Sequence, residues 1–193
     1  MILSNVELQK ALDDRRLIIT PEPQPRRPSA GGLHCPYDTH SVDLTLGEII
    51  SIPEEGAFIY DPTLPKLAAT ITRNSRPVKL SNDSPYELKR NVFVLGITRE
   101  TVELPIKDDT PPLAARIEGK SSRARCGLLV HFTAPTVHPG WSGPLTLEMI
   151  NLGAASILLR PGMPIAQLIV EEVKGTPFEN PSDFRGQSTP PGI

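Results

Sequence analysis

Short apolar runs separated by turn residues fill the chain from Val92 onward, and they restrict the folds open to it. The runs that we expect to form strands are residues 92–97, 100–104, 113–118, 128–133, 144–150, 156–159 and 164–173. Strands at this spacing are typical of an all-β barrel or sandwich. The chain also contains 22 prolines, which disfavour an all-helical protein because proline lacks the N–H that an internal helical residue donates.

The N-terminal end departs from this β pattern. Ser4 and Glu7 have the spacing of a capping box, so the sequence predicts a short helix that ends at about Asp13 or Asp14. The length of 193 residues is enough for one complete hydrophobic core. We therefore expect a single all-β domain over residues 1–193, with one short helix at its N-terminal end.

Two segments interrupt the pattern of strands, and we expect both to be loop insertions. Residues 22–38 are rich in proline, and residues 61–88 hold many polar turn formers. His34 and Cys35 lie in the first segment and His40 follows it, which raises the question of zinc. A structural zinc site needs four ligands, and the sequence offers no second pair of cysteines. We therefore expect no zinc site.

Charge and hydropathy exclude several classes of protein. The net charge is −2 at pH 7, so no general positive field attracts nucleic acid. No apolar run reaches the roughly 18 residues that a membrane-spanning helix needs, and no secretory signal is visible. The two cysteines, Cys35 and Cys126, are too few for a disulfide framework. We expect a cytoplasmic protein that binds neither membranes nor nucleic acid.

Glu148 is the residue that most directly indicates chemistry. It lies within Leu145–Ile150, a run that otherwise has the pattern of a buried strand. A carboxylate flanked by apolar residues is costly to bury unless another group pairs with it. Two interpretations stay open: a structural ion pair with Arg125 or Arg160, or a general acid/base whose surroundings tune its pKa.

The segment Gly119–Gly127 carries hydroxyl groups and cations, and we expect it to form one helical turn between two strands. Ser121 or Ser122 is a natural N-cap, and the glycine at the end of the segment is a natural stop. Free backbone N–H groups at a helix start can hold phosphate, and Lys120 adds positive charge. Ser121 and Arg125 are four residues apart and face the same way. The alternative is a capped surface turn with solvated cations.

The turn Pro139-Gly140 lies between His138 and Trp141. Trp141 is either a core anchor or a lid over a bound base. A core position is the simpler interpretation for Trp141. His131 falls on an alternating strand, so we expect a hydrogen-bonded core histidine rather than a ligand.

Several of these stretches closely resemble the dCTP deaminase family, which belongs with the dUTPases in one superfamily. The matching stretches are Ile117–His131, Thr133-Ala134, Pro139–Gly143, Leu147-Glu148, Asn151–Gly153, Arg160–Met163 and Ile165–Leu168, with Ser4–Pro21 and Ser41–Gly47 towards the N-terminus. The run Gly-Lys-Ser-Ser-x-Ala-Arg, together with Pro-Gly-Trp and the strand glutamate, is a specific signal. Only residues 22–38 and 61–88 lie outside the resemblance.

The resemblance implies a distorted β-barrel or jelly roll of the dUTPase-like type, assembled as a homotrimer with active sites between subunits. It implies hydrolytic deamination of dCTP, or of a related pyrimidine nucleotide, to dUTP and ammonia. Mg²⁺ would accompany the triphosphate, and the deamination would use no zinc. The tail over residues 175–193 would close over the nucleotide.

The same resemblance assigns roles to individual residues. Glu148 would be the proton shuttle, and Arg125 and Ser121 would position it and the attacking water. The other residues expected to contact the nucleotide are Lys120, Ser122, Ala134, His138, Trp141, Gln167, Arg185 and Gln187. No residue is expected to bind a metal directly.

Three residues differ from the family pattern. His138 stands where the family usually has aspartate, Asp183 where it tends to have lysine, and Phe178 where it has tyrosine. Two alternatives therefore stay open. The first is a dUTPase, or a bifunctional enzyme that ends at dUMP and pyrophosphate. The second is a non-catalytic nucleotide-binding regulator on the same scaffold.

Overall fold

The structure is a computed structural model, and it describes residues 1–29, 31, 34–56, 58–63, 65–178, 184 and 186–192. Its helices in this part of the chain are α1 (Asn5–Asp13), α2 (Leu67–Arg73) and α3 (Ser121–Ala124). Its strands are β1 (Ile18–Thr20), β2 (Val42–Pro53), β3 (Ser75–Lys79), β4 (Tyr86–Leu88), β5 (Phe93–Glu103), β6 (Leu113–Gly119), β7 (Leu128–Val130), β8 (Thr136–Val137), β9 (Ser142–Asn151), β10 (Ile157–Leu159) and β11 (Pro164–Glu172).

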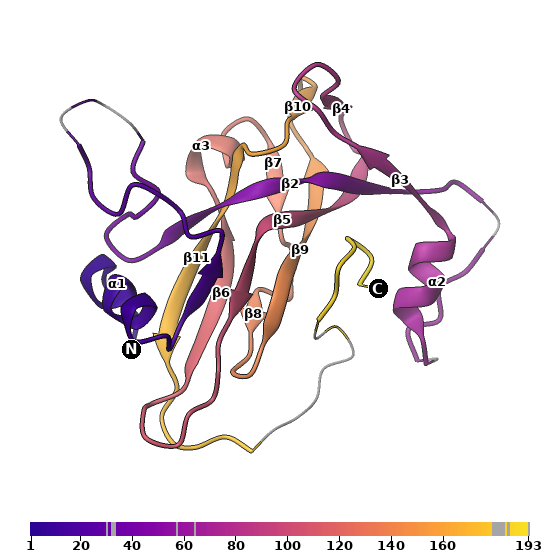
Figure 1. The fold of residues 1–193 in the computed structure, drawn as a ribbon. Coiled ribbons are helices and arrows are strands. Elements are labelled where there is room, and N and C mark those ends of the chain that lie inside the picture. Colours follow the sequence, from indigo (N-terminus) through magenta and orange to yellow (C-terminus); the bar gives the residue numbers. More distant parts are fainter. Residues whose placement is uncertain are drawn as a thin grey trace.

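Antiparallel pairing joins most of these strands into one curled sheet (Figure 1). The order along the sheet is β7-β9-β5-β2-β11-β6-β8, with β1 added against β5 and β3 against β2. The pairing register shifts between Ile97 and Thr101 on β5, and between Leu46 and Ile50 on β2. Such irregularities bend a strand and increase its twist, which helps the sheet to curl. The expected all-β fold with a short N-terminal helix is confirmed.

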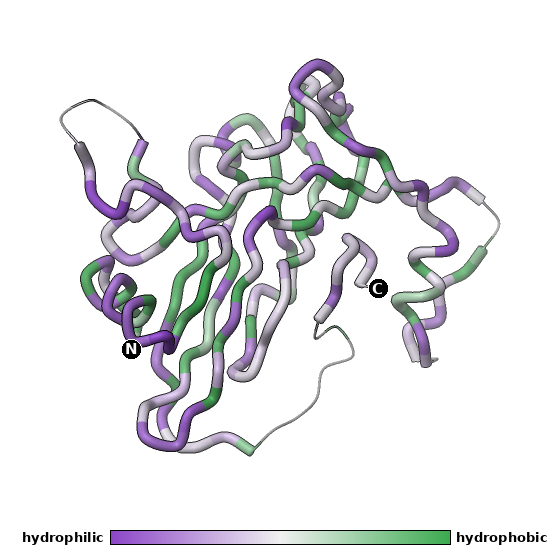
Figure 2. Tube along the Cα trace, viewed as in Figure 1, coloured by the Kyte–Doolittle hydropathy of each residue, from purple (hydrophilic) through white to green (hydrophobic). Residues whose placement is uncertain are grey.

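The curled sheet surrounds the hydrophobic core, and Figure 2 shows apolar residues concentrated along its strands. On β9, Leu145, Leu147 and Met149 are buried in this core, as the alternation predicts. Thr146 and Glu148 therefore face the other side of the strand, where the cavity described below lies.

Helix α1 begins as its sequence predicts. The Ser4 hydroxyl accepts a hydrogen bond from the Glu7 backbone N–H at 3.4 Å, which satisfies one of the free N–H groups at the helix start. Leu8 and Leu12 are buried against the core. The helix is thus held by one apolar face and a capped N-terminus.

Local structure differs from expectation in three places. Residues 61–88, expected to be a loop insertion, contain α2, β3 and β4. The strand β3 forms in spite of its polar composition because it pairs along β2. The runs 92–97 and 100–104 are one continuous strand, β5. The strand expected over residues 128–133 ends at Val130.

Candidate active site

A cavity of about 600 Å³ opens beside β9. Its walls come from the segment between β7 and β9, from β9 itself, from α2 and from the C-terminal segment, which lies between β9 and α2 in Figure 1. The polar side chains on its wall are His131, Thr136, His138, Thr146, Glu148 and Gln187, together with the indole of Trp141. A mostly apolar cavity with a few convergent polar groups is typical of a small-molecule site.

Five residues predicted for the site lie together on this wall. They are Ala134, His138, Trp141, Glu148 and Gln187. The predicted residues Lys120, Ser121, Ser122, Arg125 and Gln167 do not line it. The sequence motifs thus fall into two groups within one chain.

The Glu148 carboxylate points into the cavity from β9, and its side chain is 30% exposed. Its Oε2 accepts a hydrogen bond from the Phe132 backbone N–H at 3.1 Å. It forms no ion pair with Arg125 or Arg160, both of which the structure describes, and Arg160 donates instead to the Asn82 carbonyl at 2.6 Å. The interpretation as a structural ion pair with one of these arginines is therefore wrong.

His131 is the partner of Glu148. Its Nδ1 lies 3.6 Å from Glu148 Oε2, and its side chain is only 8% exposed. Its Nε2 is 2.7 Å from the Ala134 carbonyl oxygen. A carbonyl can only accept a hydrogen bond, so Nε2 carries a proton. His131 therefore lies between the Glu148 carboxylate and the Ala134 backbone.

The contact between His131 and Glu148 is close, but at 3.6 Å it is longer than a hydrogen bond. His131 Nδ1 is buried and has no hydrogen-bond partner among the described residues. A carboxylate and an imidazole are both groups that can act as general acids and bases. The cavity wall therefore carries two such groups side by side.

The expectation that the His131 side chain is buried and hydrogen-bonded is confirmed, but its expected place on a strand is wrong, because β7 ends at Val130. Its backbone N–H still donates to the Glu148 carbonyl at 2.7 Å, but its φ of 65° ends β7 and turns the side chain. Positive φ is uncommon for residues other than glycine and often marks a functional site. The alternating pattern of the sequence gave no sign of this change of direction.

Trp141 packs against the core, which was the simpler of its two interpretations, and it also lies at the cavity. Its Nε1 donates to the Gly143 carbonyl at 3.1 Å. The tight turn before it is present, because the Trp141 backbone N–H donates to the His138 carbonyl at 3.2 Å and Gly140 has a φ of 82°. His138 itself is exposed at the cavity rim.

The described part of the C-terminal segment lies along β9. Gln187 is 7% exposed, and its Nε2 donates to the Pro144 carbonyl at 2.9 Å. The Thr146 hydroxyl donates to the Pro190 carbonyl, also at 2.9 Å. Arg185, a predicted nucleotide contact, and Asp183, a departure from the family pattern, lie outside the described residues.

The second group of predicted residues gathers on α3, which follows β6. Ser121, Ser122 and Arg125 are all exposed, and the Arg125 backbone N–H donates to the Ser121 carbonyl at 3.1 Å. The predicted helical turn is therefore present. Its N-cap, however, is Lys120 without a side-chain hydrogen bond, so the expectation of a serine cap is wrong.

The turn of α3 ends in a close crossing of two backbones. Gly127 has a φ of 93°, and a Cβ there would lie 2.2 Å from the Gly153 backbone nitrogen. Gly153 in turn donates its N–H to Asn151 Oδ1 at 2.8 Å. Only glycine fits at such a crossing, so this contact fixes α3 relative to the end of β9.

Lys120 is held by a buried carboxylate that the sequence did not indicate as part of the site. Its ammonium forms an ion pair with Asp43 on β2, a residue that is 5% exposed. The other oxygen of Asp43 is 2.7 Å from His34 Nε2. Gln167 on β11 is paired in register with Asp43 and accepts a hydrogen bond from the Ser41 hydroxyl at 3.5 Å.

The described part of the chain lacks two further features. No group of three or more His, Cys, Asp or Glu side chains there is arranged to hold a metal ion. No helix there has the length and apolar character needed to cross a membrane.

Comparison with known proteins adds to this geometry. A family model described as dCTP deaminase-like matches residues 2–173. The dCTP deaminase of Thermomicrobium roseum is 37% identical over 174 residues, which cover 90% of this chain and 80% of that protein. The dUMP-forming dCTP deaminase of Dictyoglomus turgidum is 36% identical over 184 residues, which cover 94% of this chain and 84% of that protein.

A solved structure supports the fold. The 2'-deoxycytidine 5'-triphosphate deaminase from Agrobacterium tumefaciens matches with a TM-score of 0.59 at 19% identity, over 88% of this chain. The match covers 47% of that structure's chain, so this chain spans about half of its length. Fold and site thus define a β-rich protein with a carboxylate in an apolar cavity. The chain belongs to the dCTP deaminase-like family.

Proposed function

We propose that this protein is a hydrolase that converts dCTP and water to dUTP and ammonia. The observation that carries the proposal is the pairing of Glu148 with His131 on the wall of the apolar cavity. Membership of the dCTP deaminase-like family and relatives named dCTP deaminase support it. The reaction needs a group that accepts and returns protons, and a carboxylate beside an imidazole is able to do so.

Glu148 would act as the proton shuttle in each step. As water adds to C4 of cytosine, Glu148 would take one proton from the water and pass it to N3. It would then take the proton of the new C4 hydroxyl and deliver it to the amine. The C4–N4 bond breaks, and ammonia leaves. General acid/base catalysis of this kind contributes about 10²- to 10⁴-fold in rate.

The residues around the cavity would select and orient the base. The Ala134 backbone, held by His131 at 2.7 Å, would contact the base and the attacking water, and Trp141 would form an apolar wall. His138 and Gln187 would contact the rest of the nucleotide from the cavity rim. We also propose that the tail from residue 175 onward closes over the bound nucleotide, and that residues 1–193 act as one domain.

The exposed residues of α3 would complete the site from a second copy of the chain. Arg125 and Ser121 would position Glu148 and the water, and Lys120 and Ser122, with Gln167 nearby, would hold the phosphates. These residues do not line the cavity of their own chain, which supports a homotrimer with sites between subunits. Mg²⁺ binds chiefly through substrate phosphates and water, so the triphosphate itself would carry it. We propose a cytoplasmic location for this activity.

Ammonia release from dCTP tests the function directly. The Glu148→Gln variant keeps the shape of the side chain but cannot accept a proton, so its rate should fall by at least about 10²-fold. Glu87→Gln, on the exposed face of β4, is the matched control and should keep the wild-type rate. Full activity of Glu148→Gln would remove this residue from the mechanism.

A mixing experiment tests the shared site. Glu148→Gln and Arg125→Leu subunits are inactive alone, but an equal mixture that exchanges subunits places an intact glutamate opposite an intact arginine at about a quarter of cyclic interfaces. Activity should therefore recover to about that fraction. If mixing restores nothing while exchange is demonstrated by mass spectrometry, the two groups do not meet across subunits.

A second candidate function is favoured by the relatives. Several are named dCTP deaminase, dUMP-forming, which makes a bifunctional enzyme that ends at dUMP and pyrophosphate a specific alternative. Pyrophosphate release measured beside ammonia release separates the two products. A non-catalytic nucleotide-binding regulator would instead bind dCTP in calorimetry and release neither product.

A further inference from the structure

Asp43 is a buried carboxylate that holds two cationic or donating side chains. It lies on β2 between Val42 and Leu44, which are fully buried, and is itself 5% exposed. One oxygen pairs with the Lys120 ammonium, and the other is 2.7 Å from His34 Nε2. A carboxylate buried to this degree needs both contacts, because each unsatisfied oxygen would carry a desolvation penalty.

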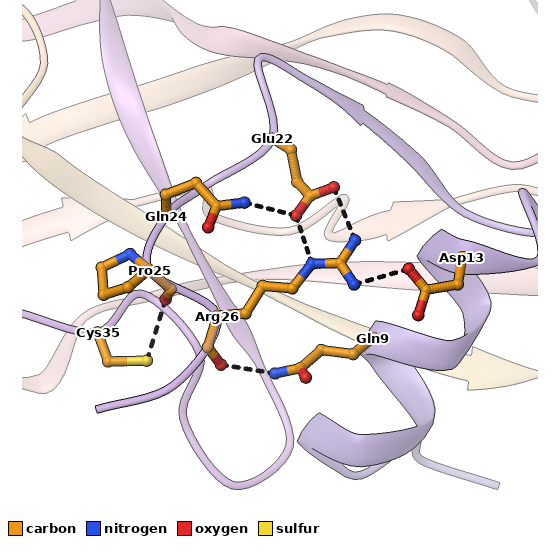
Figure 3. A network of polar contacts seen from close by, with 7 residues as sticks. All are labelled: Gln9, Asp13, Glu22, Gln24, Pro25, Arg26 and Cys35. Carbon is orange, nitrogen blue, oxygen red and sulfur yellow. Dashed lines mark hydrogen bonds and ion pairs between the residues drawn. The ribbon is translucent and has the colours of Figure 1, made fainter. Parts of the chain in front are cut away.

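His34 reaches Asp43 from the proline-rich segment of residues 21–38, and the described residues 22–26 of this segment are anchored to α1. Figure 3 shows the contacts that hold it. Arg26 donates to Glu22 and Asp13, Gln9 donates to the Arg26 carbonyl, and the Cys35 thiol donates to the Pro25 carbonyl. The last contact lies one residue from His34, so the network fixes the part of the loop from which the imidazole extends.

The position of Lys120 leaves it able to bind a second anion. An ammonium has three N–H donors, and Asp43 takes one of them. The Lys120 side chain is 18% exposed, so its end is partly accessible. Asp43, however, places a negative charge close to any phosphate that Lys120 would hold, and like charges at short range in a poorly solvated place repel.

We propose that His34 is a positioning residue that raises affinity for the triphosphate by satisfying Asp43, so that Lys120 remains available to phosphate. This inference rests on the proposed role of Lys120 in nucleotide binding. The imidazole N–H occupies Oδ2, fixes the plane of the carboxylate and offsets part of its charge. Without it, both oxygens of Asp43 compete for Lys120. The loop of residues 21–38, which lies largely outside the family resemblance, would thus tune the phosphate half of the site.

The test compares His34→Ala, His34→Gln and His40→Ala. The His34 side chain is 64% exposed, so its removal should leave the fold intact, which thermal unfolding checks. Calorimetry with inorganic tripolyphosphate should show about three- to tenfold weaker binding for His34→Ala, the loss expected for one hydrogen bond to a charged group near the surface. His34→Gln keeps a donor at similar reach and should recover most of the affinity. His40→Ala, whose ring contacts only the neighbouring Thr39 hydroxyl among the described residues, should bind as the wild type does.

Kinetics provide the second measurement. KM for dCTP should rise by the same factor as the tripolyphosphate dissociation constant, with a much smaller change in kcat, because phosphate binding is shared by the ground state and the transition state. Unchanged tripolyphosphate binding by His34→Ala would overturn the inference, as would a wild type that does not bind tripolyphosphate. If the wild type binds it in a His34-dependent manner but releases no ammonia from dCTP, the proposed deamination fails while this inference holds.

Discussion

Replacing Tyr37 by phenylalanine should stabilise the protein, and the reason lies in its buried hydroxyl. Tyr37 is 5% exposed, and its hydroxyl has no hydrogen-bond partner among the described residues. A buried polar group without a partner costs about 1–3 kcal/mol. Phenylalanine keeps the ring and removes the unsatisfied group. We therefore expect the free energy of unfolding at neutral pH to rise by about 1 kcal/mol.

The same substitution should change the response to alkaline pH. Burial raises the pKa of Tyr37 to about 12, and the negative charge of Glu22 adds to the effect. The native state therefore keeps its proton at a pH where the unfolded chain, with an ordinary value near 10, has lost it. The free energy of unfolding of the wild type is therefore unaffected by this group below pH 10. It falls by at most about 2.7 kcal/mol as the pH rises from 10 to about 12. The Tyr37→Phe variant lacks this loss.

Urea unfolding measures both effects. The difference in unfolding free energy between Tyr37→Phe and the wild type should be positive at pH 7.5 and should widen from pH 10 to 11.5. Tyr60→Phe is the matched control, because Tyr60 is exposed, and its difference from the wild type should stay near zero. A Tyr37→Phe variant that is less stable at neutral pH by 1 kcal/mol or more would show that the hydroxyl has a partner and that the reasoning from packing is wrong.

Three further predictions follow from the site and its supports. His131→Gln should lower the rate of ammonia release by about 10²-fold, because it removes the imidazole beside Glu148, while thermal unfolding stays close to wild type. Gly127→Ala should lower the free energy of unfolding by about 3 kcal/mol or more, since its Cβ would meet backbone at 2.2 Å. Gly162→Ala, where φ is also positive but the space is open, should lose only about 1 kcal/mol in the same urea titration. The pKa of Glu22 is lowered by its hydrogen bond with Arg26, so the ionised carboxylate should stabilise the protein above the ordinary carboxyl pKa and cease to do so as the pH falls through the lowered value. The wild type should therefore lose about 0.5 kcal/mol of unfolding free energy in acid that Glu22→Gln does not lose, and 1 M salt should reduce this difference between the two proteins.

Local patterns in the sequence predicted much of the fold because their causes are local. The cap of α1 depends on two residues three positions apart, and the Ser4 hydroxyl does accept the Glu7 N–H. The alternation along β9 follows from strand geometry, and it correctly separated the buried Leu147 from the outward-facing Glu148. The turn of α3 was also predicted, from capping residues at its start and a glycine stop at its end, although its N-cap is Lys120 rather than a serine.

The missed features depend on contacts between distant segments. His131 fits an alternating strand, and only its positive φ in the folded chain turns it towards Glu148. Asp43 reads as the polar position of a half-buried strand, and its link to Lys120 arises because β2, β11 and β6 are neighbours in the sheet. No pattern within either segment predicts the contact of His131 with Glu148 or of Asp43 with Lys120. The curl and order of the sheet decide it.

The separation of the two groups of residues has a physical basis. Proton transfer to a pyrimidine base is favoured in a cavity with little water, and Glu148 lies beside His131 on the wall of a mostly apolar cavity. A triphosphate instead needs cations, and burying several unpaired cations in the same cavity would cost far more than one chain can offset. Exposed positions on α3 keep Arg125 solvated until an anion arrives. A site assembled from two copies would therefore combine the apolar cavity of one copy with the exposed cations at the α3 turn of the other. Neither copy would have to bury unpaired charge while it folds.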